Sequence, residues 1–422
     1  MKILASLMLA GALLPAQQKT LTLGEAEEIA LRNHPRIRAA ELRAQAAGEA
    51  VTQARSPLLP QFGASLTAVH AQELTRITAG TLQDSSLSSR VAGGLTLSQL
   101  LTDFGRTSKL AASEESRRRS LREETFYNRA RVRLHVREFF YRGLMAQAVL
   151  ESARKNLEMR QLTARQIGKL AESNLRSSLD VSFAEVNVSE AELLVVRGEN
   201  ELAAALSELS AAMGQTEAEN YVLQGENQVR PPEISSEPLV RKAREQRPDL
   251  ASLRLRQDSA ARFADAERRL KFPSVQALGA TGLLPFAERR LPSSYGGFGL
   301  NVNIPIFNGK LFQARHAEAA LKSEAISQEV REFEVKVANA VRIAWLNEQT
   351  AWRRLTVTHR LAEQAQRTLR LAQTRYDLGL GSIIELSQAQ LNRTNAEIAD
   401  ASARYDYQWR GAVVEYETGV LR

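Results

Sequence analysis

The sequence predicts a mainly α-helical chain with a smaller β part in a membrane, built from a strand pair and a long helical hairpin that each occur twice. Two segments, 106–172 and 310–377, contain no proline and almost no glycine. A continuous helix of that size would be about 100 Å long at about 1.5 Å per residue, which no globular core accommodates. Before each of these segments, shorter stretches alternate apolar and polar residues, which is the period of a strand with two unlike faces.

The duplication is visible at two fixed offsets. Asn33–Ile37 aligns with Gln246–Leu250 at an offset of 213, and Leu179–Val181 aligns with Ile384–Leu386 at an offset of 205. Three further identities keep the second offset, and they pair Ala184, Asn187 and Ala191 with Ala389, Asn392 and Ala396. Constant spacing indicates an internal repeat, so we predict two copies of one structural plan.

Each copy is expected to run through helices, two strands and a coiled-coil hairpin. The first repeat is predicted to cover residues 17–230 and the second residues 231–422. Within the repeats we expect strands at about 57–72, 89–102, 273–284 and 294–307. We expect the hairpin tips near 174–178 and 379–382.

The first helix of each copy is expected to be interrupted by a proline. Thr22 and Glu25 fit the S/T-x-x-E capping box, in which two side chains bond free backbone amides at a helix start. Pro35 and Pro248 then interrupt the helices, because proline has no amide hydrogen and disfavours the helical conformation of the preceding residue.

Apolar residues stand at every second position in the strand candidates. The clearest set is Phe298, Leu300, Val302, Ile304 and Ile306, and the first copy has Phe62, Ala64, Leu66 and Ala68. This pattern gives one apolar and one polar face. It fits a half-buried sheet in water, and it also fits the wall of a membrane barrel that turns its apolar face to lipid.

The second helix of each hairpin shows a heptad pattern. In the first copy the positions are Leu179, Ser182, Val186, Ser189, Leu193 and Val196. In the second copy they are Ile384, Ser387, Leu391, Thr394, Ile398, Ala401 and Tyr405. Alternating steps of three and four residues predict coiled-coil packing along these positions.

Composition argues against several classes of function. The chain has 56 basic and 48 acidic residues, and their interleaving predicts a surface of ion pairs rather than a nucleic-acid patch. There is no cysteine, and the five histidines stand singly, so thiolate sites and zinc-hydrolase motifs are missing from the sequence. Catalysis and metal binding therefore have little support in the residues themselves.

The first residues predict export. Met1 and Lys2 precede an apolar run over residues 3–14, and polar residues follow from Gln17. Such a run is too short to span a bilayer as a helix and fits the core of a signal peptide, which we predict to be residues 1–16. No later segment is as long as a membrane helix, so we expect any membrane-spanning part to consist of strands.

Four strands in a membrane cannot close into a barrel by themselves. An open edge leaves backbone groups unpaired in lipid, and known barrels begin at about eight strands. Several chains would therefore have to pool their strands. Two copies would give a barrel of about eight strands filled by side chains, and three would give a wider one that can hold water. The residues alone leave the copy number open.

Seven short motifs follow one another along the chain. They are Leu21–Ala26, Asn33–Pro35, Ser56–Gln61, Leu97–Gln99, Asp103–Arg106, Pro305–Gly309 and Tyr376–Ser382. In this order the sequence resembles the TolC-type outer-membrane efflux ducts over nearly the whole chain after the signal peptide. The resemblance implies a homotrimer, in which a twelve-stranded β-barrel in the outer membrane of a Gram-negative bacterium joins a twelve-helix α-barrel in the periplasm.

The resemblance also implies a function and partners. Such a duct is a passive exit conduit of a tripartite efflux or type I secretion system. It works with a periplasmic adaptor and an inner-membrane pump, sits in outer-membrane lipid, and has no enzyme activity, no cofactor and no nucleic-acid partner.

Site residues follow from the same resemblance. Asp180 and Tyr376 match positions that pair to hold the periplasmic gate closed, through a phenol that donates to a carboxylate, and Glu385 matches an acidic position that lines the entrance. The residues at the tips match the surface on which the adaptor docks: Leu175, Arg176, Ser177, Gly379, Leu380, Gly381 and Ser382. Gly381 stands where the family has an arginine or a similar polar residue.

Two other functions remain open from the residues alone. A periplasmic coiled-coil adaptor or scaffold protein would account for the heptads but not for the alternating strands. An enzyme with an all-α core would require a cluster of acid, base or metal ligands, which the scattered histidines do not offer.

Overall fold

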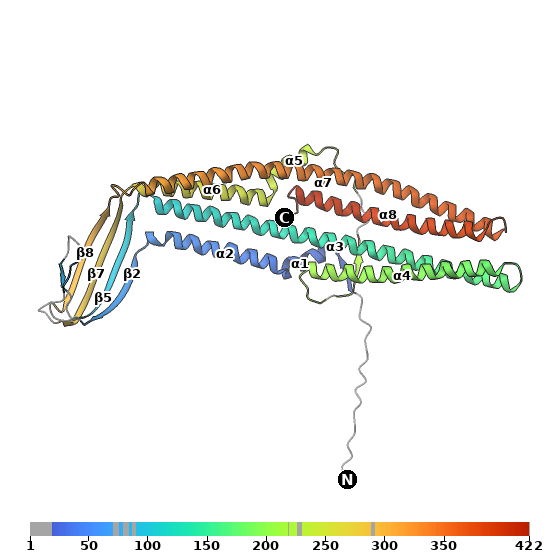
Figure 1. Ribbon diagram of the computed structural model, residues 1–422, viewed down its shortest axis with the longest axis horizontal. Coiled ribbons are helices and arrows are strands. Elements are labelled where there is room, and N and C mark those ends of the chain that lie inside the picture. Colours follow the sequence, from blue (N-terminus) through green and yellow to red (C-terminus); the bar gives the residue numbers. More distant parts are fainter. Residues whose placement is uncertain are drawn as a thin grey trace, which may run out of the picture. The chain divides into compact units, whose positions relative to one another are not determined.

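Most of the described chain is helical (Figure 1). The computed structural model describes residues 19–70, 76–78, 84–86, 90–217, 219–225, 230–287 and 292–421, and the predicted signal peptide over residues 1–16 lies outside them. The helices are α1 (Leu23–Asn33), α2 (Pro35–Arg55), α3 (Arg106–Glu172), α4 (Ser178–Ala212), α5 (Glu237–Gln246), α6 (Pro248–Arg268), α7 (Leu311–Asp377) and α8 (Ile383–Glu417). The strands are β1 (Lys19–Thr22), β2 (Gln61–Val69), β3 (Arg76–Thr78), β4 (Asp84–Ser86), β5 (Arg90–Thr102), β6 (Tyr221–Gln224), β7 (Ser274–Ala287) and β8 (Ser294–Asn303).

Helices of equal length recur in the two halves of the sequence. α3 and α7 each contain 67 residues, and α4 and α8 each contain 35. α2 and α6 both contain 21. Their first residues keep the offsets seen in the sequence, since Pro35 and Pro248 are 213 positions apart and Ser178 and Ile383 are 205 apart. These lengths support a duplication of one structural plan.

The short helices are bounded by the predicted signals. The Thr22 amide donates to Glu25 Oε2 at 2.8 Å, and Thr22 Oγ1 accepts from the Glu25 amide at 3.3 Å, which completes the capping box of α1. α1 ends just before Pro35, and α5 ends just before Pro248. After α2 and α6 the chain makes single 3₁₀ turns, η1 (Ser56–Leu58) and η2 (Arg269–Lys271).

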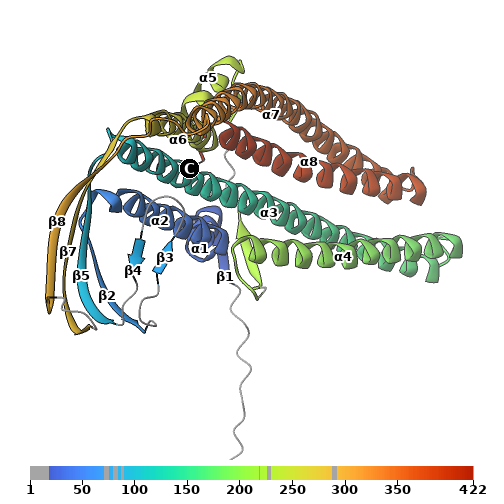
Figure 2. The ribbon, with the colours of Figure 1, turned by 60° about the vertical axis from the view of Figure 1, so that its left-hand side comes forward.

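Four long strands form one antiparallel sheet in the order β2-β5-β7-β8 (Figure 2). β2 pairs with β5 and β7 pairs with β8, which are the two predicted strand pairs, and β5 pairs with β7 between them. Large apolar side chains of this sheet lie on its surface. Phe62, Leu66 and Phe298 are 79%, 81% and 75% exposed. A sheet with such a surface requires an apolar environment or a partner.

The strand ends differ from the prediction. β2 begins at Gln61 rather than near residue 57, because η1 around Pro57 ends the preceding helical segment. β8 ends at Asn303 rather than near residue 307, and Pro305, which has no amide hydrogen to donate, follows its end. β7 is longer than predicted and reaches Ala287. Residues 71–72 of the first predicted strand lie outside the described residues.

Among the described residues, the first compact unit comprises 19–38 and those within 126–247 and 336–421. In its core, Phe140 of α3 is only 1% exposed, and it is surrounded by apolar residues from α1, α4, β1 and β6. β1 and β6 pair in parallel. Gln147 donates to and accepts from the backbone of Leu223, at 3.3 and 3.1 Å, which fixes β6 against α3.

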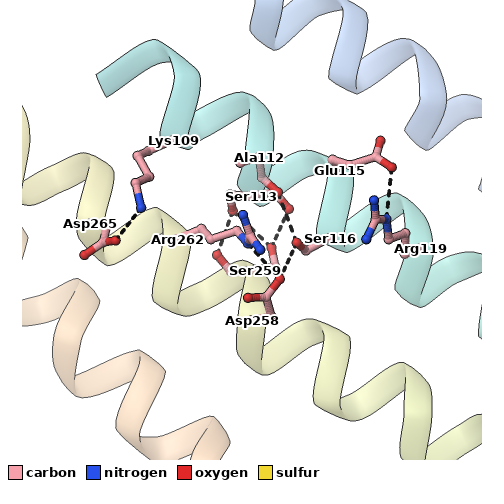
Figure 3. A network of polar contacts seen from close by, with 10 residues as sticks. All are labelled: Lys109, Ala112, Ser113, Glu115, Ser116, Arg119, Asp258, Ser259, Arg262 and Asp265. Atoms are coloured by element: carbon pink, nitrogen blue, oxygen red, sulfur yellow. Dashed lines mark hydrogen bonds and ion pairs between the residues drawn. The ribbon is translucent and has the colours of Figure 1, made fainter. Parts of the chain in front are cut away.

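The second compact unit comprises residues 39–125 and 248–335. It contains a contact between α3 and α6 that is made of polar side chains, part of which Figure 3 shows. We call this contact the α3–α6 ladder, and it consists of Ser113, Ser116 and Ser120 on α3 with Ser252, Asp258 and Ser259 on α6. Ser113 and Ser259 each donate to the other's backbone carbonyl, at 2.8 and 2.9 Å. Ser116 donates to Asp258 Oδ2 at 2.6 Å.

The seam between α3 and α4 is not the predicted heptad. The buried residues of α4 include a small one at every seventh position: Ala184, Ala191, Gly198 and Ala205. The predicted positions are exposed instead, with Leu179, Val186 and Leu193 at 63%, 57% and 59%. In α8 the predicted set is divided, since Thr394 is buried while Ile384 is 65% exposed. The physical reason is close helix approach, because a Cβ added at Gly198 would lie 3.3 Å from a Leu150 methyl group.

Candidate functional site at the hairpin tips

The first hairpin tip is the turn between α3 and α4, residues 173–177. Asn174 has a φ of 57°, a left-handed conformation that asparagine adopts more readily than most residues. Ser177 then caps α4, since its hydroxyl accepts from the Asp180 amide at 3.2 Å and the Asp180 carboxylate accepts from the Ser177 amide at 3.3 Å. Asp180 is therefore fixed at the start of α4 by a capping box.

The second hairpin tip is the turn between α7 and α8, residues 378–382. Gly379 has a φ of 72° and provides the left-handed residue of this reversal. Ser382 caps α8 by accepting from the Glu385 amide at 3.2 Å. Arg375 Nε lies 3.1 Å from Glu385 Oε1. The predicted gate carboxylate Glu385 is thus already paired with a cation of its own hairpin.

Sequence reasoning missed Arg375. Its Nη2 donates to the Leu380 carbonyl at 3.2 Å, so the same side chain holds both the turn and Glu385. Gly381, where the resemblance implies an arginine or a similar polar residue, lies close to this side chain, since a Cβ added at Gly381 would lie 3.3 Å from Arg375 Cβ. The available signal was a basic residue directly before the predicted gate tyrosine.

Tyr376 is buried, at 6% exposure, between the two hairpins. The guanidinium of Arg176, from the first tip, lies 4.6 Å from the centroid of its ring, which is a cation–π contact. The predicted hydrogen bond from Tyr376 to Asp180 is not formed, because the carboxylate of Asp180 turns back to cap α4, and the phenol oxygen has no hydrogen-bond partner among the described residues. Burial raises the pKa of the Tyr376 phenol.

A buried apolar cluster joins both hairpins near the tips. We call it the tip cluster, and it consists of Ile167, Ala184, Leu369, Ala372, Tyr376, Ile383, Leu386 and Ala389. The cluster takes residues from α3, α4, α7 and α8, so its burial stabilises the state in which the hairpins are packed together. Leu386 and Ile167 are both fully buried, at 0% exposure.

Polar bonds between α3 and α8 lie beside the tip cluster, and sequence reasoning missed these as well. Thr394 donates to Asn156 Oδ1 at 3.0 Å, and Gln390 donates to Thr163 Oγ1 at 3.3 Å. We call these two bonds the α3–α8 rungs. All four side chains are at most 8% exposed. Polar residues at heptad spacing on the inner face of a coiled coil were the signal that could have revealed them.

The remaining predicted tip residues lie at the surface of the two turns. Leu175 and Leu380 are 70% and 69% exposed. Ser177 and Ser382 are exposed as well, while Gly381 is half-buried. The first tip therefore presents one large apolar side chain within a short turn, and the second tip presents two, because Leu378 is 68% exposed as well.

Metal-binding clusters and membrane-spanning helices are two further features that bear on function in the described residues. Among them, no group of three or more histidine, aspartate or glutamate side chains is arranged to hold a metal ion. None of the described helices combines the length and the apolar character needed to cross a bilayer.

Comparison with known proteins finds one family model and several solved structures that match this architecture. The family model of outer membrane efflux proteins matches residues 28–215 and 239–412. The CmeC outer membrane channel of Campylobacter jejuni has a TM-score of 0.78 at 18% identity, over 94% of this chain and 85% of that chain. VceC of Vibrio cholerae has a TM-score of 0.76 at 18% identity, over 94% and 96%. The open state of the MtrE channel of Neisseria gonorrhoeae has a TM-score of 0.77 at 18% identity, over 94% and 88%.

At these identities the structural matches show a common fold. A search of curated protein sequences finds no significant match. The fold, with its four-stranded sheet and two long hairpins, is that of the outer-membrane channels. The chain belongs to the outer membrane efflux protein family.

As a member of that family, the protein is an exit duct of the outer membrane that extends into the periplasm of a Gram-negative cell and acts within an efflux system. The family consists of conduits rather than enzymes. It gives no support to the alternative of a periplasmic scaffold protein.

Proposed function

We propose that three copies of the chain form one duct, with a twelve-stranded β-barrel in the outer membrane and a twelve-helix α-barrel in the periplasm. In the described sheet, β2 and β8 each have a single strand neighbour. Open sheet edges in lipid leave backbone groups unpaired, so edge strands of neighbouring copies must meet. Four strands from each of three copies give a barrel wide enough to hold water.

The exposed face of α4 supports contact between copies. Five large apolar side chains of this helix are between 44% and 63% exposed: Leu179, Phe183, Val186, Leu193 and Val196. Four of them, all except Phe183, occupy the predicted heptad positions, which is the pattern that packs against another helix. Since the small-residue seam already serves α3, this second stripe remains available for a helix of a neighbouring copy.

We propose that the two tips form the periplasmic entrance and its gate. Three symmetry copies of Glu385 would make an acidic ring of the kind that selects cations. Arg375 neutralises part of that charge. The negative electrostatic potential of the ring therefore depends on whether the Arg375–Glu385 pair at 3.1 Å is intact. Asp180 and Tyr376 take part by fixing the start of α4 and by anchoring α7 in the tip cluster.

The exposed surface of the tips supports docking of a periplasmic adaptor that links the duct to an inner-membrane pump. Leu175 and Leu380 present apolar side chains to solvent, flanked by Arg176, Ser177 and Ser382. A small apolar anchor within a polar rim is a common form of protein contact. Gly379 and Gly381 of the second turn themselves carry no side chain that would obstruct such a partner.

The proposal is tested by the mass of the detergent-extracted protein, measured by light scattering and corrected for bound detergent. We expect the protein in the membrane fraction at three times the mass of the mature chain. A monomer that is soluble without detergent would contradict the duct.

A variant pair tests the α4 face separately. We expect Val186→Asp with Leu193→Asp to shift the protein from trimer to monomer, because two carboxylates cannot be buried in an apolar seam without a large cost. The matched control is Glu185→Ala with Glu192→Ala, at exposed positions of the same helix, which should remain trimeric. If the aspartate variant stays trimeric, α4 does not form the subunit contact.

A further inference from the structure

Arg160 of α3 is a buried cation. The residue is 4% exposed, and its Nη1 atom is enclosed without a hydrogen-bond partner among the described residues. Burial lowers the pKa of the guanidinium, although Glu190 acts in the opposite direction. An ionised side chain removed from water and left unpaired opposes the fold that buries it, so this position needs a physical explanation.

Arg160 lies between the two α3–α8 rungs in sequence. Asn156 is one helical turn before it and Thr163 is one turn after it, and both bond to side chains of α8. The three residues are buried at steps of four and three, which places them on one face of α3. The guanidinium therefore belongs to the face of α3 on which α8 packs. Separation of the two hairpins would return it to water.

Other arginines of α3 show what Arg160 lacks. Two of them form ion pairs with glutamates of α4, Arg142 with Glu208 at 2.6 Å and Arg154 with Glu199 at 2.8 Å. These two ion pairs define the antiparallel register of α3 and α4, and in that register Glu190 is the acidic residue of α4 opposite Arg160. Glu190 is exposed, and its charge reaches Arg160, but the two side chains form no ion pair within 4.0 Å in the described structure.

From this arrangement we propose that Arg160 is a release residue of the gate, whose buried and incompletely paired charge opposes the packing of α3 on α8 and moves to water and Glu190 when the hairpins separate. The inference rests on the proposed function, because it concerns the opening of the same entrance. The tip cluster favours the packed state through apolar burial, and Arg160 limits how stable that state becomes. A trimer contains three copies of Arg160, so three such charges oppose the packed state.

The test combines two measurements on the full-length assembled protein. The first is conductance in planar lipid bilayers. The second is the distance between nitroxide labels at Glu172→Cys and Asp377→Cys, in assemblies diluted with unlabelled chains. Because the natural chain has no cysteine, these two thiols are the only labelling sites. The variants are Arg160→Met and Glu190→Gln, and the matched control is Arg154→Met on the same helix.

We expect Arg160→Met to reduce both the opening events and the wide-distance population by roughly tenfold, since an apolar side chain of similar length removes the buried charge. Glu190→Gln should act in the same direction but more weakly, because water still receives the guanidinium. Arg154→Met should behave like the wild type. Arg160→Gln, a shorter neutral variant, serves in the same way if the methionine variant does not assemble.

The inference is overturned if assembled Arg160→Met opens as the wild type does, if Arg154→Met reduces opening equally, or if the wild type shows narrow distances only. Failure of the proposed function has a different signature. A wild type that never conducts contradicts the duct, whereas a wide-distance population that Arg160→Met removes still supports the release role.

Discussion

Helix α3 makes a polar contact with α6 in one compact unit and a polar contact with α8 in the other, and these two contacts are built differently. In the α3–α6 ladder the polar side chains bond one another or the backbone, and the Asp258 carboxylate accepts from both Ser116 and Arg262 (Figure 3). The α3–α8 rungs instead flank Arg160, whose Nη1 atom has no partner among the described residues.

The difference separates a permanent contact from one that can be broken. A fully satisfied polar network rigidifies the helices it joins, whereas a partly satisfied network retains the desolvation cost of the unpaired group. The ladder therefore fixes α3 to α6. The rungs align α3 with α8 but contribute less stability, so the hairpins depend on the tip cluster to stay together.

The largest effect is expected at Glu267, which lies just beyond the ladder. This carboxylate is 2% exposed and forms ion pairs with Arg106 and Arg315 at 3.5 and 2.7 Å. Glu267→Ala should lower the free energy of unfolding by about 3–5 kcal/mol, because it leaves two cations without their buried partner. Denaturant unfolding followed by circular dichroism measures the loss.

The control for this variant is Glu318→Ala. Glu318 forms an exposed ion pair with Lys322, and such pairs contribute little to stability. Equal losses in the two variants would show that the second compact unit does not depend on its buried ionic contact.

The tip cluster should come next. Leu386→Ala removes a fully buried side chain that joins α8 to the other helices, and we expect a loss of about 3 kcal/mol. Because the contact between hairpins depends on this cluster, the wide-distance population of labels at the tips should grow. Ser173→Ala, in the exposed first turn, is the control and should leave the distances unchanged. An unchanged Leu386→Ala distribution would contradict the role of the cluster.

A smaller effect is expected at the rungs. Asn156→Ala removes the side-chain acceptor of the buried Thr394 hydroxyl, which keeps the Gln390 carbonyl at 3.0 Å as its other acceptor, and should cost about 1 kcal/mol. Replacing both partners, with Asn156→Leu and Thr394→Val, should recover most of that loss, because no buried polar group is left unpaired. Thermal unfolding of the single and double variants distinguishes the two cases. A double variant that is less stable than the single one would show that the rung itself contributes to stability.

The smallest effect is a pH dependence at Tyr376. Burial raises the pKa of this phenol above its ordinary value near 10. A group whose pKa is raised in the packed state contributes stability at pH values below its ordinary pKa, and this contribution is lost as pH rises through the raised pKa. We therefore expect tip separation to increase above about pH 10 in the wild type. Tyr376→Phe should not show this increase, and identical pH profiles would disprove the assignment.

Much of the fold follows from the sequence because its signals are local. Pro35 and Pro248 interrupt helices through a missing amide hydrogen, and Thr22 with Glu25 begins one through a capping box. Such effects act within a few residues, so a single sequence reveals them. The tips are equally local, since Gly379 adopts the left-handed conformation that ends a helix.

The choice of helix faces was not predictable in the same way. α4 carries two interleaved heptads, and the one with larger side chains, such as Val186, has the stronger hydrophobic signal. The hairpin instead buries the small residues, as at Gly198, because close approach of backbones decides that contact. Burial of Arg160 was hidden for a related reason. One arginine among 56 basic residues does not reveal which of them lacks a partner.

The equal lengths of α3 and α7, and of α4 and α8, have a consequence for how such a protein changes its reach. Deleting one heptad from both helices of a single hairpin would shorten that hairpin by about 10 Å. In a trimer, short and long hairpins would then alternate around the periplasmic end. To span a wider or narrower cell envelope, the chain must therefore gain or lose matching segments in four helices at once. A change in the length of the periplasmic part therefore requires whole heptads to be added to or removed from both repeats of the chain.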